Sequence, residues 1–127
     1  MKNSNPLVSV IMNCHNSETF LRQAIESVIN QSYKNWELIF WDNFSTDGSS
    51  KILKSFKDKR IKYFFSKKFT SLGKARNLAL NEASGEFIAF LDCDDLWYSN
   101  KLLKQIPLFK DKEVGLVISN TIFFGDK

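Results

Sequence analysis

The stretch FIAFLDCDDLW, residues 87–97, joins a short apolar run to three acidic residues. The apolar part, Phe87–Leu91, predicts a buried β-strand, and Asp92, Asp94 and Asp95 follow directly after it. Carboxylates this close repel one another, so we expect a ligand or partner to offset their charge. Oxygen ligands in this pattern suit a hard divalent cation, Mg²⁺ or Mn²⁺. An Asp-rich surface turn or a helix cap is the alternative for such a motif in isolation.

Outward from this strand, apolar runs alternate with helical patterns along the chain. Further strands are predicted at Leu7–Met12, Trp36–Trp41, Ile61–Phe65 and Val114–Ser119. Helices are predicted at about 17–31, 49–57 and 71–83, and from about residue 99 until Pro107 kinks or ends the last one. We expect Asn16 or Ser17 to cap the first helix. This alternation predicts an α/β fold, a Rossmann-like three-layer α/β/α sandwich with a mostly parallel sheet.

Length and composition indicate one ordinary globular domain. The chain has 127 residues, of which 43% are hydrophobic and 25% are charged. No apolar run approaches the roughly 20 residues that span a bilayer, and the first residues do not resemble a secretory signal. Cys14 and Cys93 fit no zinc spacing. We therefore expect a cytoplasmic protein with two reduced thiols.

The net charge of +4 comes from a local excess of basic residues. Eight of them lie in one stretch whose only acid is Asp58: Lys51, Lys54, Lys57, Lys59, Arg60, Lys62, Lys67 and Lys68. The preferred interpretation is a solvated helix face and the loop after it. The alternative is contact with an anionic lipid surface or with nucleic acid. Because no aromatic-basic nucleic-acid module accompanies the stretch, we predict no nucleic-acid partner and keep peripheral contact with the inner face of a membrane as the alternative.

Polar residues gather where the predicted strands end. They are residues 13–16 after the first strand, residues 42–43 after the second and residues 92–95 after the fourth. In parallel sheets, ligands bind beyond the carboxyl ends of the strands, where the strand order switches. The sequence therefore predicts a binding site at this edge.

Four segments in this order resemble glycosyltransferase family 2, which has the GT-A fold: VSVIMNCHN, WDNFSTDGS, LGKARN and SGEFIAFLDCDDLW. The resemblance runs over almost the whole chain and implies that residues 1–127 form a single partial domain, the donor-binding half. It implies transfer of a sugar from a nucleotide diphosphate sugar, usually a uridine diphosphate (UDP) sugar, to a hydroxyl group. The expected acceptor is a glycan or a lipid-linked sugar of bacterial surface polysaccharide biosynthesis.

The resemblance also assigns residues to the donor. Those implied to bind the nucleotide sugar are Asn13, Cys14, His15, Asp42, Asn43, Lys74, Arg76, Asp92 and Asp94. Asp94 is implied to bind the metal that bridges the diphosphate, with Asp92 and Asp95 at the same site. The metal, with Arg76 and Lys74, would neutralise the charge that builds on the departing diphosphate.

Three departures from the family pattern bear on function. Asn43 stands where the family often has a second acid, and His15 replaces the usual aromatic residue of the first loop. The general base of an inverting transfer is expected beyond Lys127, in a longer enzyme, unless the protein is naturally short. The alternative function is a catalytically incomplete nucleotide-sugar-binding or regulatory module. A nucleotidyltransferase is disfavoured, because residues 13–16 contain no Gly, Lys or Arg.

The end of the chain carries one further expectation. The edge after Val114–Ser119 and the pair Phe123-Phe124 would be covered by the acceptor-side half in a complete enzyme of this family. Their apolar character predicts self-association through this truncated face.

Overall fold

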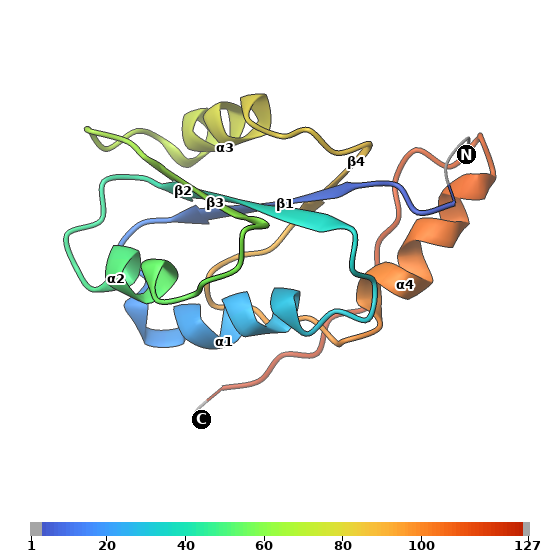
Figure 1. Ribbon diagram of the computed structural model, residues 1–127, viewed down its shortest axis with the longest axis horizontal. Coiled ribbons are helices and arrows are strands. Elements are labelled where there is room, and N and C mark those ends of the chain that lie inside the picture. The colour runs from blue at the N-terminus through green and yellow to red at the C-terminus, as the bar shows by residue number, and fades with distance from the viewer. Residues whose placement is uncertain (1–3, 126–127) are drawn as a thin grey trace.

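The computed structural model describes residues 4–125 and confirms the α/β architecture (Figure 1). Four parallel strands form one sheet in the order β3-β2-β1-β4. The strands are β1 (Val8–Cys14), β2 (Trp36–Asp42), β3 (Ile61–Phe65) and β4 (Phe87–Phe90). The helices are α1 (Glu18–Ile29), α2 (Ser49–Lys54), α3 (Leu72–Asn81) and α4 (Lys101–Gln105), followed by the 3-10 helix η1 (Ile106–Lys110).

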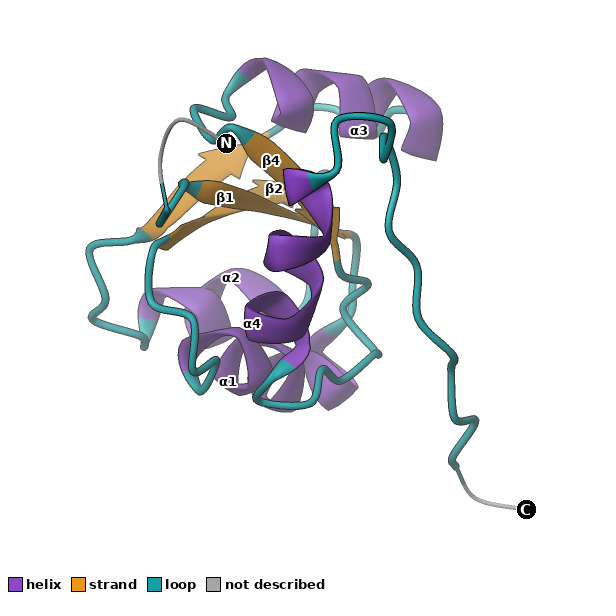
Figure 2. Ribbon diagram, turned by 90° about the vertical axis from the view of Figure 1, so that its right-hand side faces the viewer, coloured by secondary structure: helices purple, strands orange, loops and turns teal. Residues whose placement is uncertain are grey.

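The sheet lies between two helical layers because its strands are apolar on both faces. Alternate residues point to opposite faces, so Val10 and Met12 of β1 join the main core under α1, while Ile11 packs with Ala79 of α3 on the other side. Figures 1 and 2 show α3 on one face and α1 with α2 on the other. This burial on both faces explains why β1 and β2 are almost continuously apolar in sequence.

The strand order switches at β1, which pairs with β2 on one side and with β4 on the other. The register places Ile11 opposite Phe90, and the Leu91 amide donates to the Ile11 carbonyl at 3.1 Å. The loop that follows β4 therefore runs beside the end of β1. This juxtaposition brings residues 92–95 next to residues 13–16, as expected at a switch point.

The first two helices begin beside each other and cap one another. The Glu18 amide at the start of α1 donates to Asp47 Oδ2 at 3.2 Å, and the Gly48 amide donates to Glu18 Oε2 at 2.6 Å. Ser17 occupies the N-cap position of α1, but its hydroxyl donates to the His15 carbonyl instead of capping the helix. The predicted cap by Asn16 or Ser17 was therefore wrong. Asp47, in the turn after β2, supplies the acceptor for the first amide of α1 instead.

The predicted fifth strand, Val114–Ser119, was also wrong. The segment has no strand hydrogen bonds in the described structure, and Leu116 and Ile118 are 79% and 83% exposed. Figure 2 shows it running away from the sheet as an extended tail. An apolar, β-branched run forms a strand only when a neighbouring strand pairs with its backbone, and within residues 4–125 none does. Predicted ends of other elements shift by a few residues, most at α2, which stops at Lys54.

Gly85 is required by the close approach of the chain before β4 to the start of β1. A Cβ atom at this position would lie 2.6 Å from the Ser9 amide nitrogen and 2.8 Å from the Leu7 carbonyl oxygen. Replacement Gly85→Ala is therefore expected to lower the free energy of unfolding by about 2 kcal/mol, measured by urea denaturation. Gly73 in α3 is the matched control, because a Cβ there meets nothing within 4 Å. Gly73→Ala should leave stability equal or slightly higher, and equal losses in the two variants would contradict the packing argument.

Candidate functional site

The site is built at the carboxyl edge of the sheet, where loops from three strands are tied together. The Asn43 amide donates to the Cys14 carbonyl at 2.7 Å, which joins the loops after β2 and β1. The Ser66 amide donates to the Asp42 carbonyl at 2.8 Å, which adds the loop after β3. Backbone hydrogen bonds between neighbouring loops hold this edge in one arrangement before any ligand binds.

A cleft of about 430 Å³ opens at this edge, between the end of β1, the first turns of α1 and α3, and the loop after β4. Its lining residues are Asn13, Asn16, Ser17, Thr19, Phe20, Leu72, Arg76, Asp92, Cys93 and Asp94. Of the residues predicted for the site, it brings together Asn13, Arg76, Asp92 and Asp94. The remaining predicted residues do not line it: Cys14, His15, Asp42, Asn43, Lys74 and Asp95.

Several lining residues were missed by the sequence analysis. Asn16 and Ser17 directly follow the predicted loop, so its polar run held the signal for them. Phe20 and Leu72 are exposed apolar residues at the starts of α1 and α3. Nothing in their local sequence distinguishes them from core residues, because only the folded arrangement brings the two helix starts to one cleft.

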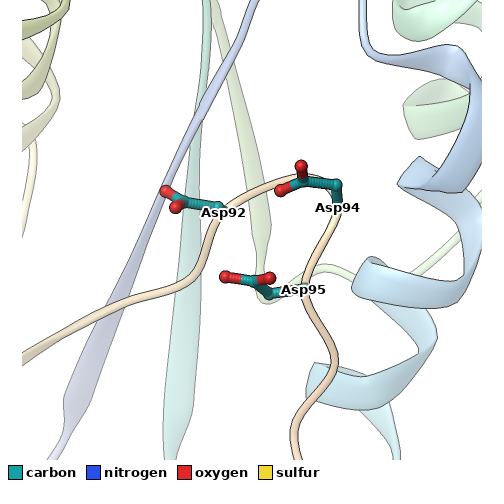
Figure 3. A group of neighbouring side chains, drawn as sticks. All are labelled: Asp92, Asp94 and Asp95. Atoms are coloured by element: carbon teal, nitrogen blue, oxygen red, sulfur yellow. The ribbon is translucent and has the colours of Figure 1, made fainter. Parts of the chain in front are cut away.

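The three acids after β4 form one exposed group (Figure 3). Each of Asp92, Asp94 and Asp95 offers a carboxylate oxygen within 4.8 Å of the others. Partial desolvation, together with the charges of Asp94 and Asp92, raises the pKa of Asp95. Part of this rise in pKa is repulsion between like charges, which a bound cation would relieve.

One cation from the protein approaches the acids. Arg76 Nη2 on α3 lies 3.7 Å from Asp92 Oδ1. Both side chains are substantially exposed, so the pair is held loosely and can open to admit an anionic ligand. Arg76 thus faces the acid group and the cleft.

The acid group fits a hard divalent cation. Ligand oxygens on opposite sides of an octahedral Mg²⁺ ion lie about 4.2 Å apart. The carboxylates need only small rotations from their 4.8 Å span to reach that spacing, and all three side chains are exposed and free to rotate. A cation here would leave coordination positions open toward the cleft, where a diphosphate could supply further oxygens.

Asn13 supplies a polar group without a partner. Its Nδ2 atom is buried and has no hydrogen-bond partner among the residues that the structure describes. A buried donor left unpaired is costly, and native structures rarely keep one without a reason. Because Asn13 also lines the cleft, a rotation of its side chain would bring this donor to an oxygen of a bound ligand.

Asp42 is fully buried, and both of its carboxylate oxygens accept hydrogen bonds. The Ser45 amide donates to Oδ1 and the Tyr63 hydroxyl donates to Oδ2, each at 2.8 Å. Burial and this hydrogen bond to Asp42 raise the pKa of Tyr63, so its hydroxyl remains a donor. The carboxylate thus holds the turn after β2 in place by accepting the hydrogen bond of the Ser45 amide from inside the protein.

Asn43 is also buried, and its side chain is used within the protein. Its Nδ2 donates to the Thr70 carbonyl at 2.8 Å, while its Oδ1 accepts from the Thr70 amide at 3.1 Å. This two-way hydrogen bonding needs both a donor and an acceptor, which an amide has and an ionised carboxylate lacks. Asn43 therefore holds the loop that precedes α3 against the turn after β2.

His15 stands exposed at the rim. Its Nδ1 lies 2.8 Å from the Asn43 carbonyl oxygen, so in this contact Nδ1–H is the donor. The ring also contacts Phe69 edge-on, with ring centroids 4.7 Å apart. In the neutral ring, Nε2 is then an acceptor, and Asn16 Nδ2 donates to it at 3.5 Å.

The two thiols lie at the base of the site. Cys14 and Cys93 are both buried and reduced, as predicted. Cys93 Sγ donates to the Asn13 carbonyl at 3.1 Å, and the hydrogen bond with the Cys14 thiol together with burial raises the pKa of Cys93. Cys93 therefore stays a neutral thiol and acts as packing between the acids. Lys74 is exposed on α3 and does not line the cleft.

Comparisons with known proteins agree on one family. The model of "Glycosyl transferase family 2" matches residues 9–127. An Escherichia coli protein named UDP-Glc:alpha-D-GlcNAc-diphosphoundecaprenol beta-1,3-glucosyltransferase WfgD is 41% identical over 114 residues, which are 90% of this chain and 45% of that protein. An uncharacterized glycosyltransferase of Haemophilus influenzae is 42% identical over 120 residues, 93% of this chain and 48% of that protein. This chain thus spans about half the length of these curated relatives.

A solved structure shows the same fold. S. aureus TarS 1–349 in complex with UDP-GlcNAc aligns with a TM-score of 0.76 and 30% sequence identity. The alignment covers 83% of this chain and 31% of the TarS chain.

Proposed function

Because the chain belongs to glycosyl transferase family 2 and has the GT-A fold, we propose that it is the donor-binding portion of a glycosyltransferase. The observation that carries the proposal is the cleft in which Asn13, Arg76, Asp92 and Asp94 meet. Its acidic residues suit a divalent cation. The Arg76 guanidinium beside them suits phosphate oxygens, and the Asn13 amide, unpaired within the protein, suits an oxygen of the sugar or the base. A nucleotide diphosphate sugar carries groups for all three.

In this proposal Asp94, with Asp92 and Asp95, holds Mg²⁺ or Mn²⁺, which would offset the charge of the diphosphate and of the departing nucleotide. Arg76 gives up its loose contact with Asp92 and pairs with the diphosphate or the sugar, and Lys74 approaches from the same helix. Asn13, Cys14 and His15 border the base, while Asp42 and Asn43 set the shape of the pocket below it. UDP is the favoured nucleotide, and the UDP-GlcNAc complex of TarS supports this choice.

The proposed reaction moves the sugar to an acceptor hydroxyl. The acceptor oxygen forms a bond to the anomeric carbon, the bond from that carbon to the diphosphate oxygen breaks, and the acceptor proton leaves to a base. Asp92 and Asp94 are the acids that line the cleft in the described residues, and both are assigned to the metal. We place the base outside the chain described here, in the acceptor-binding part of a protein as long as the relatives.

The names of the relatives support a bacterial surface glycan as the product. WfgD is named for an acceptor linked to diphosphoundecaprenol, so a lipid-linked acceptor is proposed here as well. The expected location is the cytoplasm, at the inner face of the membrane. Within residues 4–125, no helix combines the length and the apolar character needed to cross a bilayer.

Calorimetric titration of UDP into the protein tests the donor site. Binding is expected with Mn²⁺ or Mg²⁺ and is expected to weaken strongly when a chelator removes the cation, because the acid group would otherwise repel the diphosphate. Guanosine and thymidine diphosphates are the matched ligands, since they keep the diphosphate and change the base. Absence of cation-dependent binding for all three nucleotides would contradict the proposal, whereas a preference for another base would correct the nucleotide alone.

A catalytically incomplete binding module is the second candidate. It is favoured by the absence of a further acid in the described cleft to act as base. The two functions differ in turnover: a binding module keeps cation-dependent UDP binding but neither transfers nor hydrolyses UDP-sugars when the protein is studied at its natural full length.

A further inference from the structure

An aromatic and basic surface lies outside the cleft, at the edge of β3. We call it the aromatic–lysine surface and define it as Phe44, Phe65, Lys67, Lys68 and Phe69. The three aromatic residues are 40%, 48% and 60% exposed, in that order. Phe44 and Phe65 pair with ring centroids 6.3 Å apart, and Lys67 and Lys68 lie between Phe65 and Phe69 in the chain.

The fold engages several other basic residues of the stretch within the protein, whereas Lys51, Lys57 and Lys59 are exposed like Lys67 and Lys68. Arg60 pairs with Asp58 at 2.7 Å and lies over the Trp36 ring, and Lys62 pairs with Glu37 at 2.6 Å. Lys54 lies over the Tyr63 ring.

Lys67 and Lys68 remain exposed, without an ion-pair partner in the described structure. The acid in the turn after β2, Asp47, is occupied by the backbone amides of Ser49 and Glu18. The positive charge of the surface is thus not neutralised by the protein.

The surface is ordered by the protein itself, so no partner is needed to shape it. Ser66 Oγ donates to the Lys68 carbonyl at 2.7 Å, and Thr70 is held on both sides by Asn43. Phe44 adopts a left-handed backbone with φ of 62°, which is unfavourable for a large aromatic residue. Folding therefore accepts a strained conformation and still leaves this ring partly in water, a combination typical of functional positions.

We propose that the aromatic–lysine surface binds the surface of an anionic lipid bilayer. Phenylalanine rings enter the boundary between headgroups and acyl chains, and neighbouring lysines pair with lipid phosphates. An acidic protein could pair with the lysines, but it would leave three exposed rings in water. A bilayer can take up the rings in its apolar interior and pair with the lysines at its surface.

The residues of this surface follow or end β2 and β3, at the sheet edge where the cleft opens. Figure 1 shows the loops after these strands at the end of the molecule opposite to α4. A bilayer held there would bring the cleft close to lipid-linked molecules. The contact goes beyond the proposed function and does not depend on it, because lipid binding requires neither donor nor metal.

Vesicle co-sedimentation of the 127-residue chain tests the proposal. The experiment is done without divalent cations and at about 0.15 M salt. The protein is expected to bind vesicles of phosphatidylglycerol mixed with phosphatidylcholine, and to bind pure phosphatidylcholine vesicles much more weakly. The double replacement Lys67→Gln with Lys68→Gln should weaken partitioning roughly 25-fold, at about five-fold for each charge. The double replacement Phe65→Ser with Phe69→Ser should weaken it at least about five-fold.

Two control variants distinguish binding through this surface from nonspecific adsorption to vesicles. Lys110→Gln with Lys112→Gln removes the same charge at the end of η1 and just beyond it, and Phe123→Ser removes an exposed ring from the tail. Both should bind the vesicles as the wild type does. The proposal would be overturned if the controls lose as much binding as the test variants, or if the protein does not bind the anionic vesicles. It would also be overturned if the protein forms a dimer that the replacement of Phe65 and Phe69 by Ser dissociates. Calorimetry of UDP with the Lys67→Gln and Lys68→Gln variant reports separately on the donor site, because neither lysine contacts the residues assigned to the donor, whereas Phe69 packs on His15.

Discussion

Replacement of Asp94 by Asn is expected to weaken cation-dependent UDP binding about 100-fold. Loss of a partner that only orients a metal ligand already costs 10- to 100-fold in affinity, and Asp94 is proposed as a direct ligand. Asn keeps the size and one oxygen but removes the charge that a divalent cation needs. Calorimetric titration with Mn²⁺ measures the change, and in the presence of a chelator the wild type and the variant should bind equally weakly.

The fold should tolerate this change. Asp94 is exposed and stands beside two other acids, so loss of its charge relieves repulsion in the protein without metal. The thermal midpoint without cation is therefore expected to be unchanged or slightly higher, while the rise caused by Mn²⁺ with UDP should be lost. Glu113→Gln removes an exposed acid remote in sequence from the cleft and should retain that rise. Full cation-dependent binding by the Asp94 variant would remove this residue from the metal site.

Replacement of Asn43 by Asp is expected to destabilise the protein by about 3 kcal/mol, although it introduces the residue that the family often has here. The Asn43 amide donates to the Thr70 carbonyl inside the protein, at 2.8 Å. An ionised carboxylate would place an oxygen against that carbonyl and lose the donor, and a buried charge without a partner costs more than a neutral group. Urea denaturation followed by tryptophan fluorescence measures the loss at neutral pH.

The pH dependence identifies the cause of that loss. Burial against a carbonyl raises the folded-state pKa of the introduced Asp above its unfolded value of about 3.9. The folded variant then binds more protons than the unfolded chain, so its deficit against the wild type should shrink as pH falls through the folded-state pKa. Asn120→Asp in the exposed tail is the control and should change stability little at any pH. A deficit that stays constant with pH would contradict the electrostatic explanation.

The layered architecture and the sheet edge that carries the cleft were predictable from local sequence, and the family from four motifs that resemble it. Strand and helix periods repeat over a few residues, and parallel strands separated by helices leave few arrangements. The acids of FLDCDDLW stand directly after a buried strand, so their position at the sheet edge follows from chain order alone. The one strand predicted in error, Val114–Ser119, shows the limit of such patterns. Its residues are apolar and β-branched, as in a strand, but no neighbouring strand pairs with it in the described structure.

The partners of the site residues depended on contacts between distant parts of the chain. Arg76 reaches Asp92 because α3 packs on β1, and β1 pairs with β4, whose following loop carries Asp92. The Asp42 carboxylate accepts a hydrogen bond from Tyr63, and the Asn43 amide donates one to Thr70. Both side chains are therefore engaged within the protein and support the loops of the site. Such pairings join residues 16 to 27 positions apart and leave no periodic signal in the sequence. Their geometry is set by how the crossovers pack, and so it became visible only in the folded chain.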